Sequence, residues 1–261
     1  MKKGFTLLTM ILSSFMMYSQ TATDTLVTTA SDYLFKGMGM YRKENYRDAI
    51  LYYSKAIELD PKFLIAYELR GRHKFKMKDY KGAILDFSKM LEIDPKSLTA
   101  YVFKGRSKDR LKDYRGAILD FNKAIDLNRE HIDDLTDLKC ADAYVCRGSS
   151  KAKLDDQRGA IMDYNKAIEL NQVNTAAYEN RGITKFKYKD YRGAILDFDK
   201  AIETFQQDDG DLIPENLAQV YYYRGLSKIK LNQKESACLD FSKAGELGEG
   251  KAYDLIQKLC N

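Results

Sequence analysis

The sequence predicts an all-α protein built from six stacked helix pairs. Glycines recur at intervals of 34, 34, 43, 34 and 43 residues, and an alanine twelve residues after each glycine repeats those intervals. Small residues at fixed points in a period near 34 let two helices approach closely, which is typical of arrays of helix-turn-helix units. The glycines are Gly37, Gly71, Gly105, Gly148, Gly182 and Gly225, and the alanines are Ala49, Ala83, Ala117, Ala160, Ala194 and Ala237.

Aromatic residues recur in the same register. Tyr67 lies four residues before Gly71, and Phe87 lies four residues after Ala83, as the corresponding aromatics do in the other repeats. With segments such as GRHKFKMKDYKGAILDFSKM from Gly71, this pattern resembles the tetratricopeptide repeat (TPR) over residues 30 to 251. The resemblance implies a right-handed TPR solenoid of six helix-turn-helix repeats with a C-terminal capping helix. Each repeat is numbered here from place 1 to place 34, with its glycine at place 8.

The first residues form a different kind of segment. Lys2 and Lys3 precede an apolar run, Phe5 to Tyr18, that is short for a bilayer span and is interrupted by Ser and Thr. We interpret residues 1–19 as a signal peptide cut after Ser19, with an uncleaved N-terminal anchor as the alternative. The mature protein is then expected to be exported, periplasmic or otherwise associated with the cell envelope, without a transmembrane segment.

Downstream of residues 20–29, a short linker, the six repeats are expected to occupy 30–250 and the capping helix 251–261. Both 43-residue intervals contain nine extra residues, at 132–140 and 209–217, between the second helix of one repeat and the first of the next. Both insertions are acidic. A tolerated loop or an extra helical turn is the simpler interpretation, and a docking element is the alternative.

Charge and cysteine content limit the function classes. The formal net charge is +5, and removal of Lys2 and Lys3 with the leader lowers it to +3, which is too weak to indicate nucleic acid. The four cysteines do not have a metal-binding spacing. Cys238 and Cys260 are expected to lie close enough for a disulfide in an oxidising compartment, although a buried free thiol is the alternative for Cys238.

Motifs for catalysis are missing from the sequence. It has no Gly-rich phosphate loop, no paired histidines and no Gly-x-Ser-x-Gly turn. His73 and His131 are the two histidines, and a lone histidine without a second ligand or nucleophile is usually structural. We therefore predict no catalytic, metal-binding or cofactor-binding residue and no cofactor, and we expect that the protein is not an enzyme.

Charged residues repeat with the helices. Place 7 is basic in every repeat and place 11 is Lys in repeats 2 to 6, while place 23 is Asp in the same five repeats. This pattern predicts ion pairs between the two helices of a repeat. A second group of acids stands just before the second helices, where a short carboxylate can cap free N–H groups. Those predicted caps are Asp79, Asp113, Asp156 and Asp190.

A different set of residues is expected to face a partner. In the TPR family, places 2, 5, 6, 9, 12 and 13 of the first helix face the concave groove, and place 13 is basic in all six repeats here. Cations beside aromatic rings suit an extended peptide that carries acidic residues or a free carboxylate. The known carboxylate-clamp residues of chaperone-binding TPR domains are not present. The groove candidates are Arg72, Phe75, Lys76, Arg106, Arg110, Lys153, Asn180, Phe186, Lys187 and Tyr222.

The sequence therefore predicts a non-catalytic scaffold or adaptor in the bacterial cell envelope that binds a peptide or protein in its concave groove. The alternative is a module that binds oligosaccharide or nucleic acid through the same basic, aromatic-lined groove, because stacking rings and a basic track also suit single strands. The expected export of the protein argues against nucleic acid as the ligand.

Overall fold

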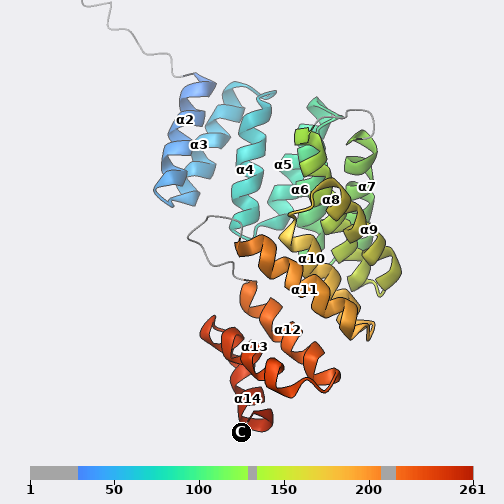
Figure 1. Ribbon diagram of the computed structural model, residues 1–261. Helices are drawn as coiled ribbons and strands as arrows, with labels where there is room; N and C mark the ends of the chain where they lie inside the picture. Colours follow the sequence, from blue (N-terminus) through green and yellow to red (C-terminus); the bar gives the residue numbers. More distant parts are fainter. Residues whose placement is uncertain (1–28, 129–133, 207–215, 261) are drawn as a thin grey trace, which may run out of the picture. The chain divides into compact units, whose positions relative to one another are not determined.

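The computed structural model describes residues 29–128, 134–206 and 216–260 (Figure 1). Within these ranges all regular structure is helical and no strand occurs, as the sequence predicts. The helices are α2 (Ala30–Arg42), α3 (Tyr46–Leu59), α4 (Leu64–Lys76), α5 (Tyr80–Ile93), α6 (Leu98–Arg110), α7 (Tyr114–Asn128), α8 (Asp134–Lys153), α9 (Gln157–Leu170), α10 (Thr175–Lys187), α11 (Tyr191–Gln206), α12 (Leu217–Lys230), α13 (Lys234–Glu246) and α14 (Gly250–Leu259).

The chain forms two compact units, Met1–Arg70 and Gly71–Asn261, and the division falls within α4. In the first unit, α2 packs against α3. In the second unit each even-numbered helix from α6 to α12 packs against the helix that follows it, and each second helix also contacts the first helix of the next repeat. Successive first helices touch as well, α6 with α8, α8 with α10 and α10 with α12. The first helices of this unit therefore form a shared surface.

The glycine and alanine ladders mark the contact between the two helices of each repeat. A Cβ atom placed on Gly105 would lie 2.7 Å from the ring of Phe121, which is fully buried. A Cβ on Gly148 would lie 2.8 Å from Tyr164, and the other four place-8 glycines face the place-24 ring of their own repeat in the same way. Ala117 is also fully buried. A larger residue at place 8 would separate the helices.

The four predicted caps are present. The Oδ1 atom of Asp79 accepts a hydrogen bond of 2.9 Å from the backbone N–H of Gly82, three residues on, and Asp113, Asp156 and Asp190 do the same. A Cβ on Gly82 would stand 2.2 Å from the other carboxylate oxygen of Asp79. The glycine after each cap thus makes room for the capping carboxylate.

The turn inside every repeat contains a residue in the left-handed backbone region. Lys112 has φ 65° and Asp155 has φ 66°, although neither is glycine. We did not predict this feature from the sequence, because lysine and glutamate give no signal for that conformation. The residues, all at place 15, are Glu44, Lys78, Lys112, Asp155, Lys189 and Asn232.

The structure accounts for part of the first insertion. Helix α8 begins at Asp134 and runs for 20 residues, so residues 134–140 lengthen this first helix toward its N-terminus. Residues 129–133, which include His131, lie outside the described residues, and so do 207–215 of the second insertion and the whole leader. His73 lies within α4 and is buried.

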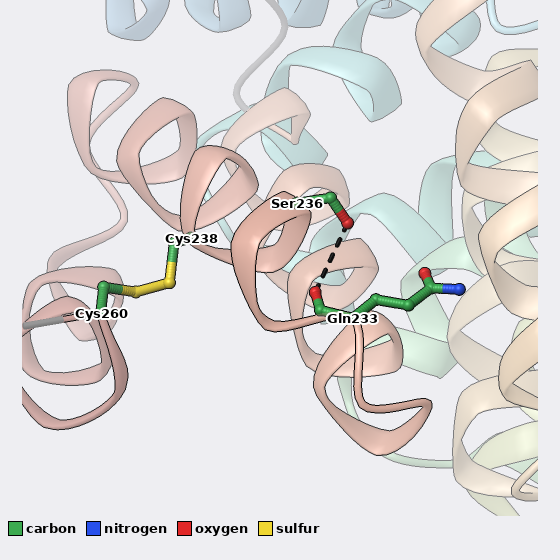
Figure 2. The surroundings of a disulfide bond; sticks show 4 residues. All are labelled: Gln233, Ser236, Cys238 and Cys260. Atoms are coloured by element: carbon green, nitrogen blue, oxygen red, sulfur yellow. Dashed lines mark hydrogen bonds between the residues drawn. A yellow bond between two sulfur atoms is a disulfide. The ribbon is translucent and has the colours of Figure 1, made fainter.

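Helix α14 is joined to α13 by a disulfide between Cys260 and Cys238, whose Cα atoms are 5.8 Å apart (Figure 2). Its Ala252 is fully buried, and the Tyr253 hydroxyl donates to the Gly245 carbonyl oxygen at 3.1 Å. The helix therefore covers the end of the last repeat. Cys140 and Cys146 form no disulfide within the described ranges.

Candidate partner-binding site

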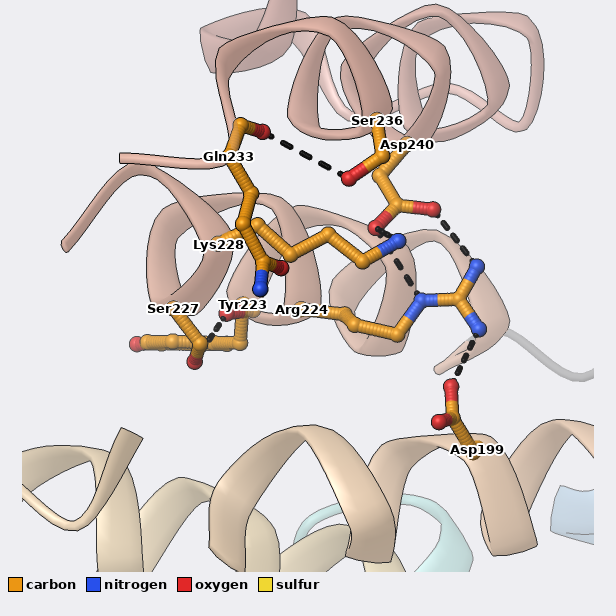
Figure 3. A network of polar contacts seen from close by, with 8 residues as sticks. All are labelled: Asp199, Tyr223, Arg224, Ser227, Lys228, Gln233, Ser236 and Asp240. Carbon is orange, nitrogen blue, oxygen red and sulfur yellow. Dashed lines mark hydrogen bonds and ion pairs between the residues drawn. The ribbon is translucent and has the colours of Figure 1, made fainter. Parts of the chain in front are cut away.

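The basic residues at places 7 and 11 are engaged in the fold. In the last repeat, Arg224 donates from Nε and Nη2 to the two carboxylate oxygens of Asp240, at 3.0 and 2.5 Å, and Lys228 lies 2.7 Å from the same carboxylate (Figure 3). Corresponding Arg and Lys residues surround Asp163 and Asp197 in repeats 4 and 5. The predicted ion pairs between the helices of a repeat are thus present.

These arginines also connect neighbouring repeats, which the sequence did not reveal. Nη1 of Arg224 donates to Asp199 at 2.7 Å, and Nη1 of Arg147 donates to Asn122 at 2.7 Å. Both acceptors stand at place 25 of the preceding repeat. Each arginine therefore uses three of its donors to hold two repeats together, and it is poorly placed to bind a partner.

A pocket of about 280 Å³ lies on the surface formed by the first helices α6, α8 and α10. It brings together four of the residues predicted from the sequence, Arg106, Arg110, Lys153 and Asn180. The remaining lining residues come from the same helices and from the ring at place 24 of repeat 3. These are Asp109, Val145, Cys146, Ser149 and Phe121.

The charges in this pocket do not cancel. Asp109 accepts hydrogen bonds from Lys153 Nζ at 2.5 Å and from the Ser150 hydroxyl at 2.8 Å, so its carboxylate is matched by Lys153. Asp142 lies near Arg106 and offsets its charge, and Arg110 then leaves an excess of positive charge. Arg110 is exposed and makes no hydrogen bond or ion pair within the described ranges. The pocket is therefore suited to an anionic group.

Arg106 is held by aromatic rings. Its guanidinium lies 5.4 Å from the ring centre of Phe75 and 5.2 Å from that of Phe103, while the guanidinium of Arg72 lies 4.7 Å from Phe103. Stacking fixes the plane of a guanidinium and leaves its N–H donors, which lie in that plane, available to a ligand. Arg72, Phe75 and Phe103 do not line the pocket, but these contacts connect them to it through Arg106.

The Cys146 thiol in the pocket is not a nucleophile at neutral pH. Burial raises the pKa of Cys146 to about 11, against a smaller opposing effect of Arg106. A neutral thiol neither attacks an electrophile nor binds a metal readily. In residues 29–128, 134–206 and 216–260 no cluster of three or more His, Cys, Asp or Glu side chains is arranged to hold a metal ion.

The other candidates lie elsewhere. Phe186 packs against Tyr191 and Tyr223, and Tyr222 packs against Tyr223 and Phe241, so both belong mainly to aromatic clusters of the core. Lys187 is exposed at the end of α10, and Lys76 stands at the end of α4. None of these four residues lines the pocket.

Sequence reasoning missed several lining residues. Val145, Cys146 and Ser149 occupy places 5, 6 and 9 of repeat 4, and Asp109 occupies place 12 of repeat 3. All four stand at groove places of the family pattern. A search of every groove place, without a restriction to basic and aromatic residue types, would have found them.

Comparisons with known proteins agree with the repeat. A family model described as tetratricopeptide repeat matches residues 40–63 and 98–131. The recurring glycines and alanines, the helix pairs and this match show that the chain contains tetratricopeptide repeats and has the tetratricopeptide-repeat fold. Proteins of this family generally serve as non-catalytic scaffolds for protein interaction. A search of curated protein sequences found no significant match.

Solved structures share the fold. PilW, a type IV pilus biogenesis factor, superposes with a TM-score of 0.72 at 17% identity, covering 87% of this chain and 98% of PilW. PilF of Pseudomonas aeruginosa gives 0.68 at 18% identity, with coverage of 88% and 96%. YrrB, described as having an unusual peptide-binding site, gives 0.54 at 22% identity, with coverage of 79% and 98%. Identities this low establish the fold alone.

Proposed function

We propose that this protein is an exported, non-catalytic scaffold or adaptor of the cell envelope. It binds a protein or peptide partner through the pocket lined by Arg106 and Arg110, which we call the first-helix pocket. The observation that carries the proposal is the pocket between α6, α8 and α10, where Arg106 and Arg110 form no ion pair within the described residues while the place-7 arginines are occupied in the fold. An acidic side chain or a terminal carboxylate is the partner group that two arginines would bind best.

The aromatic residues support a peptide as ligand. Phe75 and Phe103 continue from the pocket toward Arg72, so an extended chain could place an anionic group on the arginines and apolar side chains on the rings. An acidic oligosaccharide is the second candidate, because the same arginines and rings would also bind it.

Export is a separate part of the proposal. The charged start, the apolar run and Ser19 resemble a signal peptidase substrate, and none of the helices within the described ranges could cross a membrane. The structural relative PilW is described as a type IV pilus biogenesis factor, which suggests an assembly factor as the type of protein to test. N-terminal sequencing of protein from the envelope fraction should find a start near Gln20. A mature pool that retains Met1 would contradict export by cleavage.

The binding test compares synthetic peptides that end in acidic residues and a free carboxylate with amidated peptides carrying glutamine in place of the acids. The mature protein should bind the acidic peptides more tightly, and added salt should weaken that binding. Arg72→Ala with Arg106→Ala should reduce binding, and Arg106→Glu with Arg110→Glu should reduce it further, because charge reversal adds repulsion.

Arg147→Ala with Arg181→Ala is the matched control, since both arginines are bound to buried aspartates in the fold. This variant should have a lower melting temperature and unchanged binding. If the wild type and both arginine variants bind the acidic peptides equally well, the pocket is not the binding site. Tighter binding of a sulfated oligosaccharide than of any peptide would favour the second candidate.

A further inference from the structure

Every repeat exposes one large apolar side chain at place 22 of its second helix. The exposed fraction of these side chains ranges from 52% to 73%, although their neighbours at places 20 and 24 are buried. Helix formation alone does not explain them, because lysine or glutamate at an exposed position supports a helix nearly as well as leucine does. The residues are Leu51, Leu85, Leu119, Met162, Leu196 and Leu239.

Basic residues flank these side chains. On α9, Met162 stands between Arg158 and Lys166, four residues away on either side, so the three share one face of the helix. Leu196 stands between Arg192 and Lys200 on α11 in the same way. Lys166 and Lys200 form ion pairs with the acids three residues on, while Arg158 and Arg192 are exposed and unpaired among the described residues.

A hollow of about 450 Å³ lies between α9 and α11. Ile168 and Glu169 of α9, Lys200 and Glu203 of α11, and Tyr178 of the intervening α10 line it. Val173, which follows α9, is 61% exposed and also lines it. Met162 lies seven residues before Glu169 and Leu196 seven before Glu203, which places both apolar side chains on the faces that lead to the hollow. We call this surface, from Met162 and Leu196 to Val173, the second-helix groove.

We propose that the second-helix groove docks an acidic amphipathic helix of another protein, independently of the first-helix pocket. The groove offers apolar side chains along its length and a hollow at one end that can accept a protruding side chain. Four bases and two acids border it, so its charge is complementary to a segment rich in glutamate or aspartate. An amphipathic helix would place its apolar stripe on Met162 and Leu196 and its carboxylates near Arg158 and Arg192.

Two other occupants fit less well. A second copy of the chain would bring one net-basic groove against another, which is unfavourable. An anionic membrane would attract the arginines, but a lipid surface does not fill a hollow. It would also meet Glu169 and Glu203 beside the exposed apolar side chains.

The test uses two labelled peptides of about 18 residues with the same leucine stripe, one with glutamates and one with lysines on its polar face. Fluorescence anisotropy should show binding of the acidic helix and little binding of the basic one. Met162→Gln with Leu196→Gln should lower the affinity for the acidic helix about tenfold or more, because two exposed apolar anchors are lost while the fold is unaffected. Arg158→Ala with Arg192→Ala should also lower this affinity and should reduce its dependence on salt.

One control and one choice of background separate this surface from others. Leu85→Gln with Leu119→Gln changes the same place on α5 and α7 and should leave the affinity unchanged. Both peptides are measured in an Arg106→Ala with Arg110→Ala background, so that binding in the first-helix pocket does not contribute. The proposal is overturned if wild type does not bind the acidic helix, or binds both helices equally. It is also overturned if Met162→Gln with Leu196→Gln instead abolishes self-association or the binding of phosphatidylserine vesicles.

Discussion

Arg147 on α8 donates from Nε and Nη2 to both carboxylate oxygens of Asp163 on α9, at 2.9 and 2.6 Å. The Asp163 side chain is 4% exposed, and Lys151 lies 2.9 Å from the same carboxylate. A carboxylate this deeply buried requires charged hydrogen-bond partners, so the arginine belongs to the structural framework of the repeat.

Arg147→Ala is therefore expected to destabilise the protein by about 1–3 kcal/mol, since Asp163 would keep only Lys151 as a cationic partner. Thermal or urea unfolding measures the change. Arg158→Ala, on the exposed face of α9, is the control and should change stability by less than about 0.5 kcal/mol. Equal stability of the Arg147 variant and wild type would show that the bidentate pair contributes little.

Gly105→Ala should destabilise repeat 3 by about 1–3 kcal/mol, because the new Cβ would stand 2.7 Å from Phe121 and force the two helices apart. Gly148→Leu should disturb repeat 4 at least as much. Gly39→Ala is the matched control, since no atom lies within 4 Å of a Cβ at that helical position, and it should stabilise by about 0.5–1 kcal/mol. Hydrogen exchange measured in the affected repeat and in the other repeats distinguishes a local from a global loss of stability.

Lys112→Gly should stabilise the protein by up to about 1 kcal/mol. Lys112 has φ 65°, and glycine adopts the left-handed region without the steric cost that a side chain incurs, although its greater freedom in the unfolded chain offsets part of the gain. Lys123→Gly, inside α7, should instead destabilise by about 1 kcal/mol. A loss of stability in both variants would mean that the strain at place 15 is negligible.

Glu179 gives stability a dependence on pH. The residue is buried, and burial raises its pKa from 4.5 to about 7, while the 3.3 Å hydrogen bond from Asn216 acts in the opposite direction. The folded state therefore binds the proton more tightly than the unfolded state. The stabilisation is complete below about pH 4.5 and is lost as the pH rises toward 7.

Glu179→Gln cannot ionise, so the stability of this variant relative to wild type should increase between pH 4.5 and 7 and level off above that range. The relative gain is about 3 kcal/mol at most, because each pKa unit corresponds to about 1.4 kcal/mol. Unfolding curves across this pH range measure it. Parallel pH profiles for the two proteins would show that Glu179 titrates normally in the fold.

Reduction of the Cys238–Cys260 disulfide should release α14 before the rest of the stack unfolds. The bond closes a separation of 22 residues, for which a stabilisation of about 3 kcal/mol is typical. Faster hydrogen exchange in α14, in reduced wild type or in Cys260→Ser, would show this loss. A reductant should have no further effect on Cys260→Ser, and unchanged exchange in both would mean that packing of Ala252 and its neighbours alone holds the helix.

Much of the fold could be predicted because it depends on local and periodic features. The small size of Gly105 and Ala117 indicated a close contact between helices, and the position of Asp113 just before a helix indicated an N-terminal cap. The left-handed turn at Lys112 could not be predicted, because its conformation is imposed by the two packed helices and not by lysine. The link from Arg147 to Asn122 was missed for a similar reason, since it joins residues of different repeats.

The sequence by itself determined the repeat, its helix pairs and the class of protein, because a 34-residue period of small and aromatic residues is satisfied by one kind of stack. The tertiary structure alone decided which of the predicted groove residues lie together. Arg110 and Lys187 both stand at place 13, but Arg110 lines the pocket between α6, α8 and α10 while Lys187 is exposed at the end of α10 and does not line it. That difference depends on side-chain direction and on neighbours from other repeats, which periodicity does not specify.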